Sequence, residues 1–171
     1  MKKGIHTIRG IFDNGDNPSA SRKYSLNNGQ FDTNMRVSML ELIPAFNDHT
    51  GSAMNDPSSD TMFFVVSTSE QGAIPTTTTP GMHGTDYGLR MTDNSQIGWG
   101  YISAGYGYHK CFVDPGHIIP GDLYVNAWSI SSAGGLTQLS QDLGFMIVLE
   151  QVKNTGTEAL LYQVKETYTG G

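Results

Sequence analysis

The chain has 171 residues and a formal net charge of −6, and only 15% of its residues are charged. This length fits a single domain over residues 1–171 and excludes two independent domains, because single domains usually run to about 100–200 residues. The acidic balance excludes a primary role on phosphate backbones, which are bound by clustered lysine and arginine.

Short β-like runs separated by turn residues dominate the chain, and helical periodicity is weak before the C-terminus. The sequence therefore predicts an all-β fold, an antiparallel two-sheet sandwich that is jelly-roll-like, with about eight strands and a short C-terminal helix. The predicted strands span residues 4–12, 22–26, 35–46, 61–68, 96–103, 106–113, 122–131 and 144–152.

The N-terminal part of the chain is basic and the rest is acidic. Residues 1–36 hold six basic residues against three acidic ones, whereas the remainder holds four against thirteen. Lys2, Lys3 and Arg9 belong to this basic segment. The segment is suited to meet an acidic surface on another copy, or to mix with the acidic groups of its own fold. Nucleic acid contact is expected to be minor at most and to use this segment.

Three segments rich in turn residues separate the predicted strands, at residues 13–21, 47–60 and 71–94. The last is the longest, and loops beyond about 12–15 residues are usually functional or disordered. Thr76 and Thr77 begin a threonine run between two prolines, which favours an extended arm over an O-glycosylated stalk. We expect this arm to reach a partner.

Two of the strands are apolar almost throughout, at residues 62–66 and 145–149. Continuous apolar character is typical of strands that are covered on both faces, so both runs are predicted to lie in the core.

The strand predicted at residues 122–131 has a different, alternating pattern. Leu123 and Val125 share one face, while Asn126 and Trp128 share the other. The first face is expected to be core, and the second is a candidate contact surface.

The most unusual stretch alternates glycines with aromatic residues over positions 98–108. Trp99, Tyr101, Tyr106 and Tyr108 are suited to an aromatic platform that stacks on sugar rings. The alternative is that the glycines permit a bulge or bend while the aromatic side chains fill the sandwich or a subunit boundary. The second interpretation is favoured, because aromatic strands are common in cores and interfaces.

His109, Cys111 and His117 are the best candidates for a metal site, with Asp114 beside them. On a strand, His109 and Cys111 point to the same face, and the turn that follows would have to bring His117 back towards them. A second distant ligand pair is missing, so hydrogen-bonded histidines and a buried, inert Cys111 are favoured over a metal or a thiol nucleophile. We therefore predict no catalytic residue, no cofactor and no enzyme.

A helix is predicted near the end of the chain, where Thr155 and Glu158 have the spacing of a capping box. Apolar residues then recur at three- and four-residue intervals, among them Leu161 and Tyr168. A helix this short must pack on something, either on its own sandwich or on a neighbouring subunit.

Three segments resemble small proteins encoded in marine bacteriophage genomes: residues 24–31, 114–124 and 144–150. The resemblance implies a virion structural protein, either a jelly-roll capsid subunit or a capsid decoration protein, with no catalytic residue to carry over. It implies copies of itself and other virion proteins as partners. The expected contact residues are Lys2, Lys3, Arg9, Thr76, Thr77, Trp99, Tyr101, Tyr106, Tyr108, Leu161 and Tyr168.

The expected location is the virion, after synthesis in the host cytoplasm. His6 and Arg9 interrupt the apolar run that a signal peptide would need, and no run is long enough to span a membrane. The second interpretation of the protein's function, after a virion structural protein, is a carbohydrate-binding sandwich, lectin-like or receptor-binding, with a surface glycan as ligand. The third is a metal-dependent jelly-roll enzyme.

Overall fold

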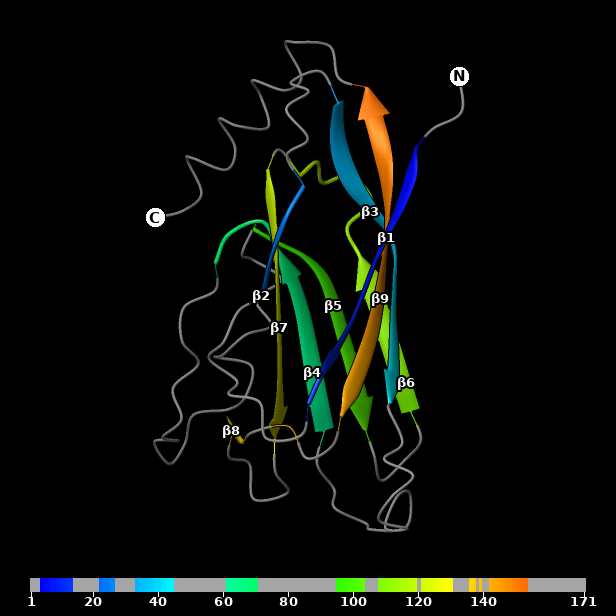
Figure 1. Cartoon of the computed structure of the whole chain (residues 1–171). Coiled ribbons are helices and arrows are strands. Elements are labelled where there is room, and N and C mark those ends of the chain that lie inside the picture. Colours follow the sequence, from blue (N-terminus) through cyan, green and yellow to red (C-terminus); the bar gives the residue numbers. More distant parts are fainter. Residues whose placement is uncertain are drawn as a thin grey trace.

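The computed structural model describes residues 4–13, 22–26, 33–44, 61–70, 95–103, 108–119, 121–130, 136–137, 139 and 142–153. Within these ranges the chain forms strands β1 to β9 (Figure 1). Their bounds are β1 Ile5–Phe12, β2 Arg22–Ser25, β3 Thr33–Pro44, β4 Thr61–Ser67, β5 Gln96–Ser103, β6 Tyr108–Val113, β7 Asp122–Ile130, β8 Leu136–Thr137 and β9 Leu143–Lys153.

The strands form two antiparallel sheets that face each other. The smaller sheet has the order β1-β9-β3, and the larger has the order β2-β7-β4-β5-β6, with β8 paired to β7. The all-β sandwich expected from the sequence is confirmed. The two-residue strand β8 was not predicted, because two residues carry no readable alternation.

The pairing follows the nested order of a jelly roll, in which early strands pair with late ones. β1 pairs with β9, β2 pairs with β7, and the inner strands β4 and β5 pair with each other. β3 meets the segment after β6 through the bridge between Met35 and Ile119. β6 itself stays with β5 in the larger sheet.

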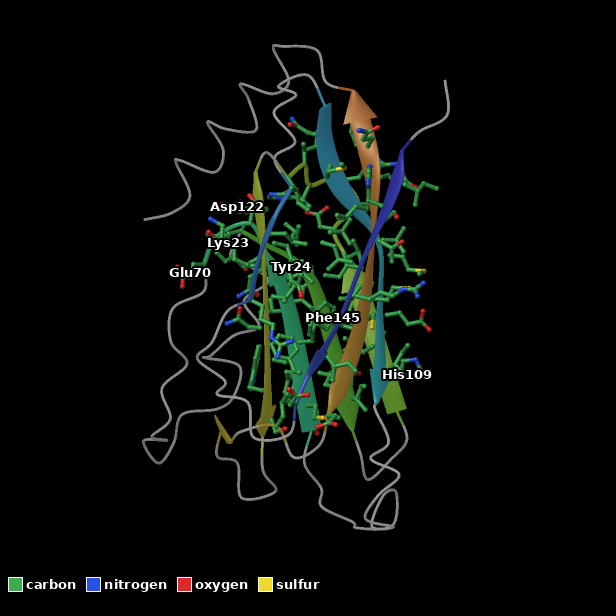
Figure 2. The ribbon with its side chains drawn as sticks, in the orientation of Figure 1. Lys23, Tyr24, Glu70, His109, Asp122 and Phe145 are labelled. Atoms are coloured by element: carbon green, nitrogen blue, oxygen red, sulfur yellow. The ribbon has the colours of Figure 1, made fainter. Side chains whose placement is uncertain are left out.

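The core lies between the two sheets and contains a cluster of aromatic rings. Phe145 from β9 lies 5.0 Å from Phe64 of β4 and 5.6 Å from Phe12 of β1, measured between ring centroids. Tyr24 of β2 packs edge-on against Phe145 at 6.4 Å, between the sheets (Figure 2). Aliphatic side chains from both inner faces surround these rings.

Two β-bulges set which side chains reach this core. The register of β3 against β9 shifts between Val37 and Met39, so that Ser38 is the extra residue. Val37 and Leu40 therefore both face inward and are buried, although they are three positions apart. A second shift opposite Val66 makes Ile97 the extra residue of β5, and Ile97 is also buried.

Two predicted burial patterns need correction. In β9, Phe145, Ile147 and Leu149 are buried, but Met146 and Val148 on the other face are only half-buried. β9 is therefore covered fully on one face, because nothing among the described strands lies over its outer face.

The second correction concerns β7. The face predicted to be a contact surface is closed at its centre, since Asn126 is 0% exposed and Trp128 is 1% exposed. Tyr124 on the same face is half-buried. Trp128 stacks on the ring of Phe63 from the neighbouring strand β4.

Some predictions fall outside the described residues: the C-terminal helix, the arm at residues 71–94, and the two shorter loop segments. In the ranges that are described, no helix has the length and apolar content needed to cross a bilayer.

Candidate functional site

The glycines and aromatic residues of β5 occupy opposite faces of the larger sheet. Gly98 and Gly100 face the smaller sheet, where a Cβ on Gly100 would clash with the Cδ1 of Leu42. Trp99 and Tyr101 alternate with them and point away from the core. The glycines thus let β3 pack closely over β5, while the aromatic rings gather on the outer face.

On this outer face, three rings form a row across neighbouring strands. The register places Tyr101 of β5 opposite Phe63 of β4, and Phe63 opposite Trp128 of β7. The ring centroids of Tyr101 and Phe63 are 6.3 Å apart, and those of Phe63 and Trp128 are 5.8 Å apart. Exposure falls along the row, because Tyr101 and Phe63 are half-buried whereas Trp128 is buried.

The accessible part of the outer face lies towards β6. Trp99 lies opposite Phe112 in the register, and its Nε1 donates a hydrogen bond to Gln96 Oε1 at 2.9 Å. Phe112 is 39% exposed, and Lys110 Nζ lies 4.6 Å from its ring centroid, within cation–π range. We call Trp99, Tyr101, Lys110 and Phe112 the aromatic surface.

An ion pair holds the edge strand β2 against the other end of the same sheet. Lys23 Nζ lies 2.6 Å from Asp122 Oδ2, and Ser25 Oγ donates to Asp122 Oδ1 at 2.8 Å. The hydrogen bond from Lys23, with that from Ser25, lowers the pKa of Asp122. The same contact with Asp122 raises the pKa of Lys23. Figure 2 shows Lys23 and Asp122 together at this edge.

The metal candidates lie on β6 and in the turn after it. His109 is exposed, Cys111 and His117 are half-buried, and Asp114 Oδ1 accepts the backbone N–H of Gly116 at 2.9 Å within the turn. In the described part of the chain, no group of three or more His, Cys, Asp or Glu residues is placed to hold a metal ion. Burial raises the pKa of the Cys111 thiol, and the charge of Glu41 raises it further, so the thiolate is disfavoured.

A second surface, on the smaller sheet, was not predicted. Four large apolar side chains are exposed there, namely Ile5 (67%), Ile11 (51%), Met39 (42%) and Ile43 (51%). With Met146 and Val148 of the central strand β9 they form what we call the aliphatic surface. Alternation in residues 4–12 already puts Ile5, Arg9 and Ile11 on one face, which is the signal that would have indicated it.

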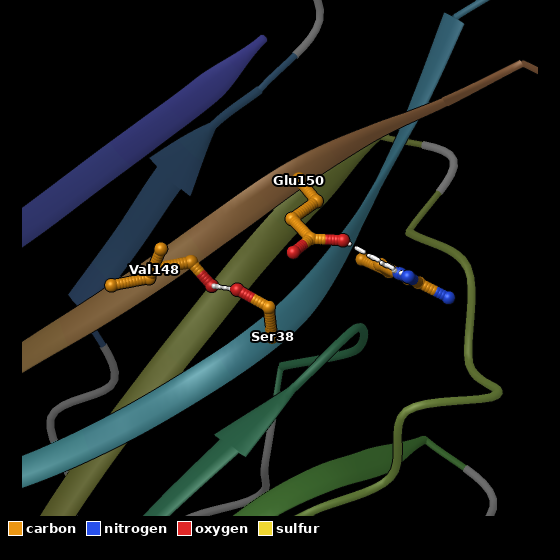
Figure 3. A network of polar contacts seen from close by, with 4 residues as sticks. Ser38, Val148 and Glu150 are labelled. Carbon is orange, nitrogen blue, oxygen red and sulfur yellow. Dashed lines mark hydrogen bonds and ion pairs between the residues drawn. The ribbon is translucent and has the colours of Figure 1, made fainter. Parts of the chain in front are cut away.

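Polar contacts border the aliphatic surface near the bulge of β3. Arg36 Nη2 and Nε lie 2.9 Å and 3.3 Å from Glu150 Oε2. Ser38 Oγ donates to the backbone carbonyl of Val148 at 3.2 Å (Figure 3). The bulge residue thus bonds to the strand beside it.

The structure places few of the predicted contact residues. Arg9 is exposed on β1, Trp99 and Tyr101 lie on the aromatic surface, and Tyr108 begins β6. The other seven lie outside the described residues: Lys2, Lys3, Thr76, Thr77, Tyr106, Leu161 and Tyr168.

No family model matches this chain, and no curated protein matches it. Among the solved structures that resemble it are two of VP1 from Trichodysplasia spinulosa-associated polyomavirus. VP1 in complex with 3′-sialyllactose has 10% identity and a TM-score of 0.39, with 86% of this chain and 93% of that chain covered. VP1 alone has 11% identity and a TM-score of 0.38, with 87% and 96% covered. The jelly-roll assignment rests on the strand pairings of the chain itself. The resemblance to bacteriophage proteins stays a prediction.

Proposed function

We propose that the chain is a virion structural protein, either a capsid shell subunit or a capsid decoration protein of a bacteriophage. It acts through repeated contacts between copies of itself and with other virion proteins, and no residue performs bond-making chemistry.

The observation that carries this proposal is that both outer faces of the sandwich expose apolar side chains. A solitary sandwich needs apolar residues only on the two inner faces, with polar residues alternating outward. Here the aliphatic surface exposes Ile5, Ile11 and Ile43, and the aromatic surface exposes Phe112 on the opposite side. Interface centres are apolar and enriched in aromatic residues, with polar groups at the rim; the aromatic surface has the rings, and the aliphatic surface has an apolar centre.

The fold supports the same proposal at the level of class. Jelly rolls recur in viral capsids, lectins and cupins, so the topology narrows the function without choosing among these. Two separate contact surfaces on one subunit favour assembly, because a closed particle needs each subunit to meet several neighbours.

The test is light scattering after size exclusion, followed by negative-stain electron microscopy, on the purified full chain over a range of concentrations. We expect concentration-dependent association into regular particles or rings. A strict monomer at high concentration that turns over a compound in an unbiased activity screen contradicts the proposal.

The second candidate is a carbohydrate-binding sandwich, which the half-exposed Trp99 and Tyr101 on one face of β5 favour. Rings of this kind stack on the apolar faces of sugars. The Nε1 of Trp99 is held by Gln96, so its orientation is fixed before a ligand arrives. In a glycan array, Trp99→Ala and Tyr101→Ala should abolish binding, whereas Met39→Ala on the opposite sheet should not. A parent protein without any signal removes this candidate.

A further inference from the structure

The aliphatic surface is arranged in rows that run across β1, β9 and β3. The register aligns three of these rows: Ile11 with Gly144 and Ile43, Arg9 with Met146 and Glu41, and Thr7 with Val148 and Met39. Two residues along a strand advance about 7 Å, so the three rows form one continuous patch.

The middle row carries opposite charges at its two ends. Arg9 and Glu41 are both exposed, and Met146 between them is half-buried. Among the described residues, neither of the two has an ion-pair partner, whereas Arg36 on the same face lies 2.9 Å from Glu150. The patch therefore has a positive edge on β1, an apolar centre, and a negative edge on β3.

We propose that this patch binds the same patch of a second copy, face to face, about a two-fold axis that runs parallel to β9. The partner is identified by complementarity, because a surface that is positive at one edge and negative at the other matches its own rotated copy.

The charges select this axis among the two-fold arrangements of stacked sheets. An axis along β9 exchanges the edges, so that Arg9 faces Glu41 of the partner subunit, and Glu41 faces Arg9 of the partner subunit. An axis across the strands would put each charge opposite its own copy. Like charges placed opposite each other weaken an interface, so the first arrangement is favoured.

The apolar rows fit the same axis. Ile11 faces Ile43 of the partner subunit, and Met146 meets its own copy at the centre. Gly144 also meets its copy, and the missing side chain there allows close approach of the two backbones. Glu150 faces its copy at the end of the patch, where Arg36 of the same chain already pairs with it.

This inference rests on the proposed function, since it assigns one of the copy-to-copy contacts that assembly requires. The test is sedimentation equilibrium on the full chain and on charge variants. Arg9→Glu and Glu41→Arg should each raise the dissociation constant by roughly tenfold to a hundredfold, because each puts two like-charge pairs into the contact. Glu70→Arg is the matched control, since Glu70 is exposed beyond the end of β4 in the other sheet, away from the patch (Figure 2).

Rescue makes the test specific. The double variant Arg9→Glu with Glu41→Arg should recover wild-type association, and so should an equimolar mixture of the two single variants. Recovery also shows that the single variants are folded. Wild-type association that neither reversal changes, or single variants that neither rescue restores, overturns the two-fold contact while leaving assembly through another surface intact. A wild-type chain that never associates overturns both this contact and the proposed function.

Discussion

The indole of Trp128 stacks on the ring of Phe63, with their centroids 5.8 Å apart and their planes at 14°. Trp128 lies on β7 and Phe63 on β4, directly opposite in the register. The stack lies on the face of β7 that alternation alone assigns to partners, and it joins two neighbouring strands of the larger sheet.

Stacked rings contribute about 0.5–1.5 kcal/mol beyond their buried area. A double-mutant cycle with Phe63→Ala and Trp128→Ala should therefore give a coupling energy in that range, measured by urea unfolding. Trp128→Ala combined with Phe145→Ala is the control, since Phe145 lies on the inner face of the other sheet, and these two changes should add to within about 0.5 kcal/mol. Equal coupling in both cycles would contradict a specific stack.

Gly100→Ala should destabilise the fold by about 1–3 kcal/mol, because the new methyl group would press on Leu42 and force the sheets apart. Gly121→Ala is the matched control, with no atom within 4 Å of the added Cβ. Thermal unfolding should show Gly121→Ala unchanged or stabilised by up to about 1 kcal/mol, through the entropy of the unfolded chain. Two variants of equal stability would mean that β3 and β5 do not pack closely.

Deleting Ser38 should abolish folding, whereas Ser38→Ala should cost only about 0.5–1.5 kcal/mol, the value of one hydrogen bond. The deletion removes the bulge residue, so a one-residue register shift turns either Val37 or Leu40 out of the core. Far-UV circular dichroism and urea unfolding distinguish the two variants. A folded deletion variant would show that the bulge is dispensable.

Asp122 should contribute stability that is lost in acid. Its pKa is lowered in the folded state, so the contribution is present above the unfolded pKa of about 3.9 and disappears as the pH falls through the lower folded value. The pKa of Lys23 is raised, so its contribution is present below about 10.4 and is lost as the pH rises through the folded value.

The difference in unfolding free energy between the wild type and Asp122→Asn should therefore be constant near neutral pH and shrink below about pH 4. Glu70→Gln serves as the control. The difference in unfolding free energy between the wild type and Glu70→Gln should not shrink in the same way below about pH 4. A constant difference for Asp122→Asn down to pH 2 would place the carboxylate outside the ion pair.

Cys111 should react slowly with a thiol reagent in the folded protein. Burial raises its pKa above the usual value of 9.0, which leaves little thiolate at neutral pH. At pH 8 we expect labelling at least about tenfold slower than in urea-unfolded protein, from the smaller thiolate fraction and the restricted access. If Cys111 is labelled as fast as a small free thiol is, the result would contradict an inert Cys111 and favour its interpretation as a nucleophile.

Local patterns were sufficient to find the long strands of this protein. The eight predicted strands coincide with β1 to β7 and β9, and the ends of β5 were predicted to the residue. Alternating or continuous apolar runs bounded by turn residues are a property of neighbouring positions, so they are readable without a fold. The alternation of glycine with Trp99 and Tyr101 is also visible in the sequence. The sequence does not reveal which strand of the other sheet packs against Gly100.

The sequence by itself determined the all-β class, the strand positions and the shortage of charge, because these follow from nearby residues and composition. Only the tertiary structure decided which faces are closed. Trp128 on an outer face is buried, whereas Ile11 and Ile43 on the other outer face are exposed although they too are apolar. Burial depends on which groups pack against a side chain, and those groups come from distant parts of the chain. Arg9 and Glu41 are 32 positions apart in the chain, and the sheet register alone puts them at the two ends of one row.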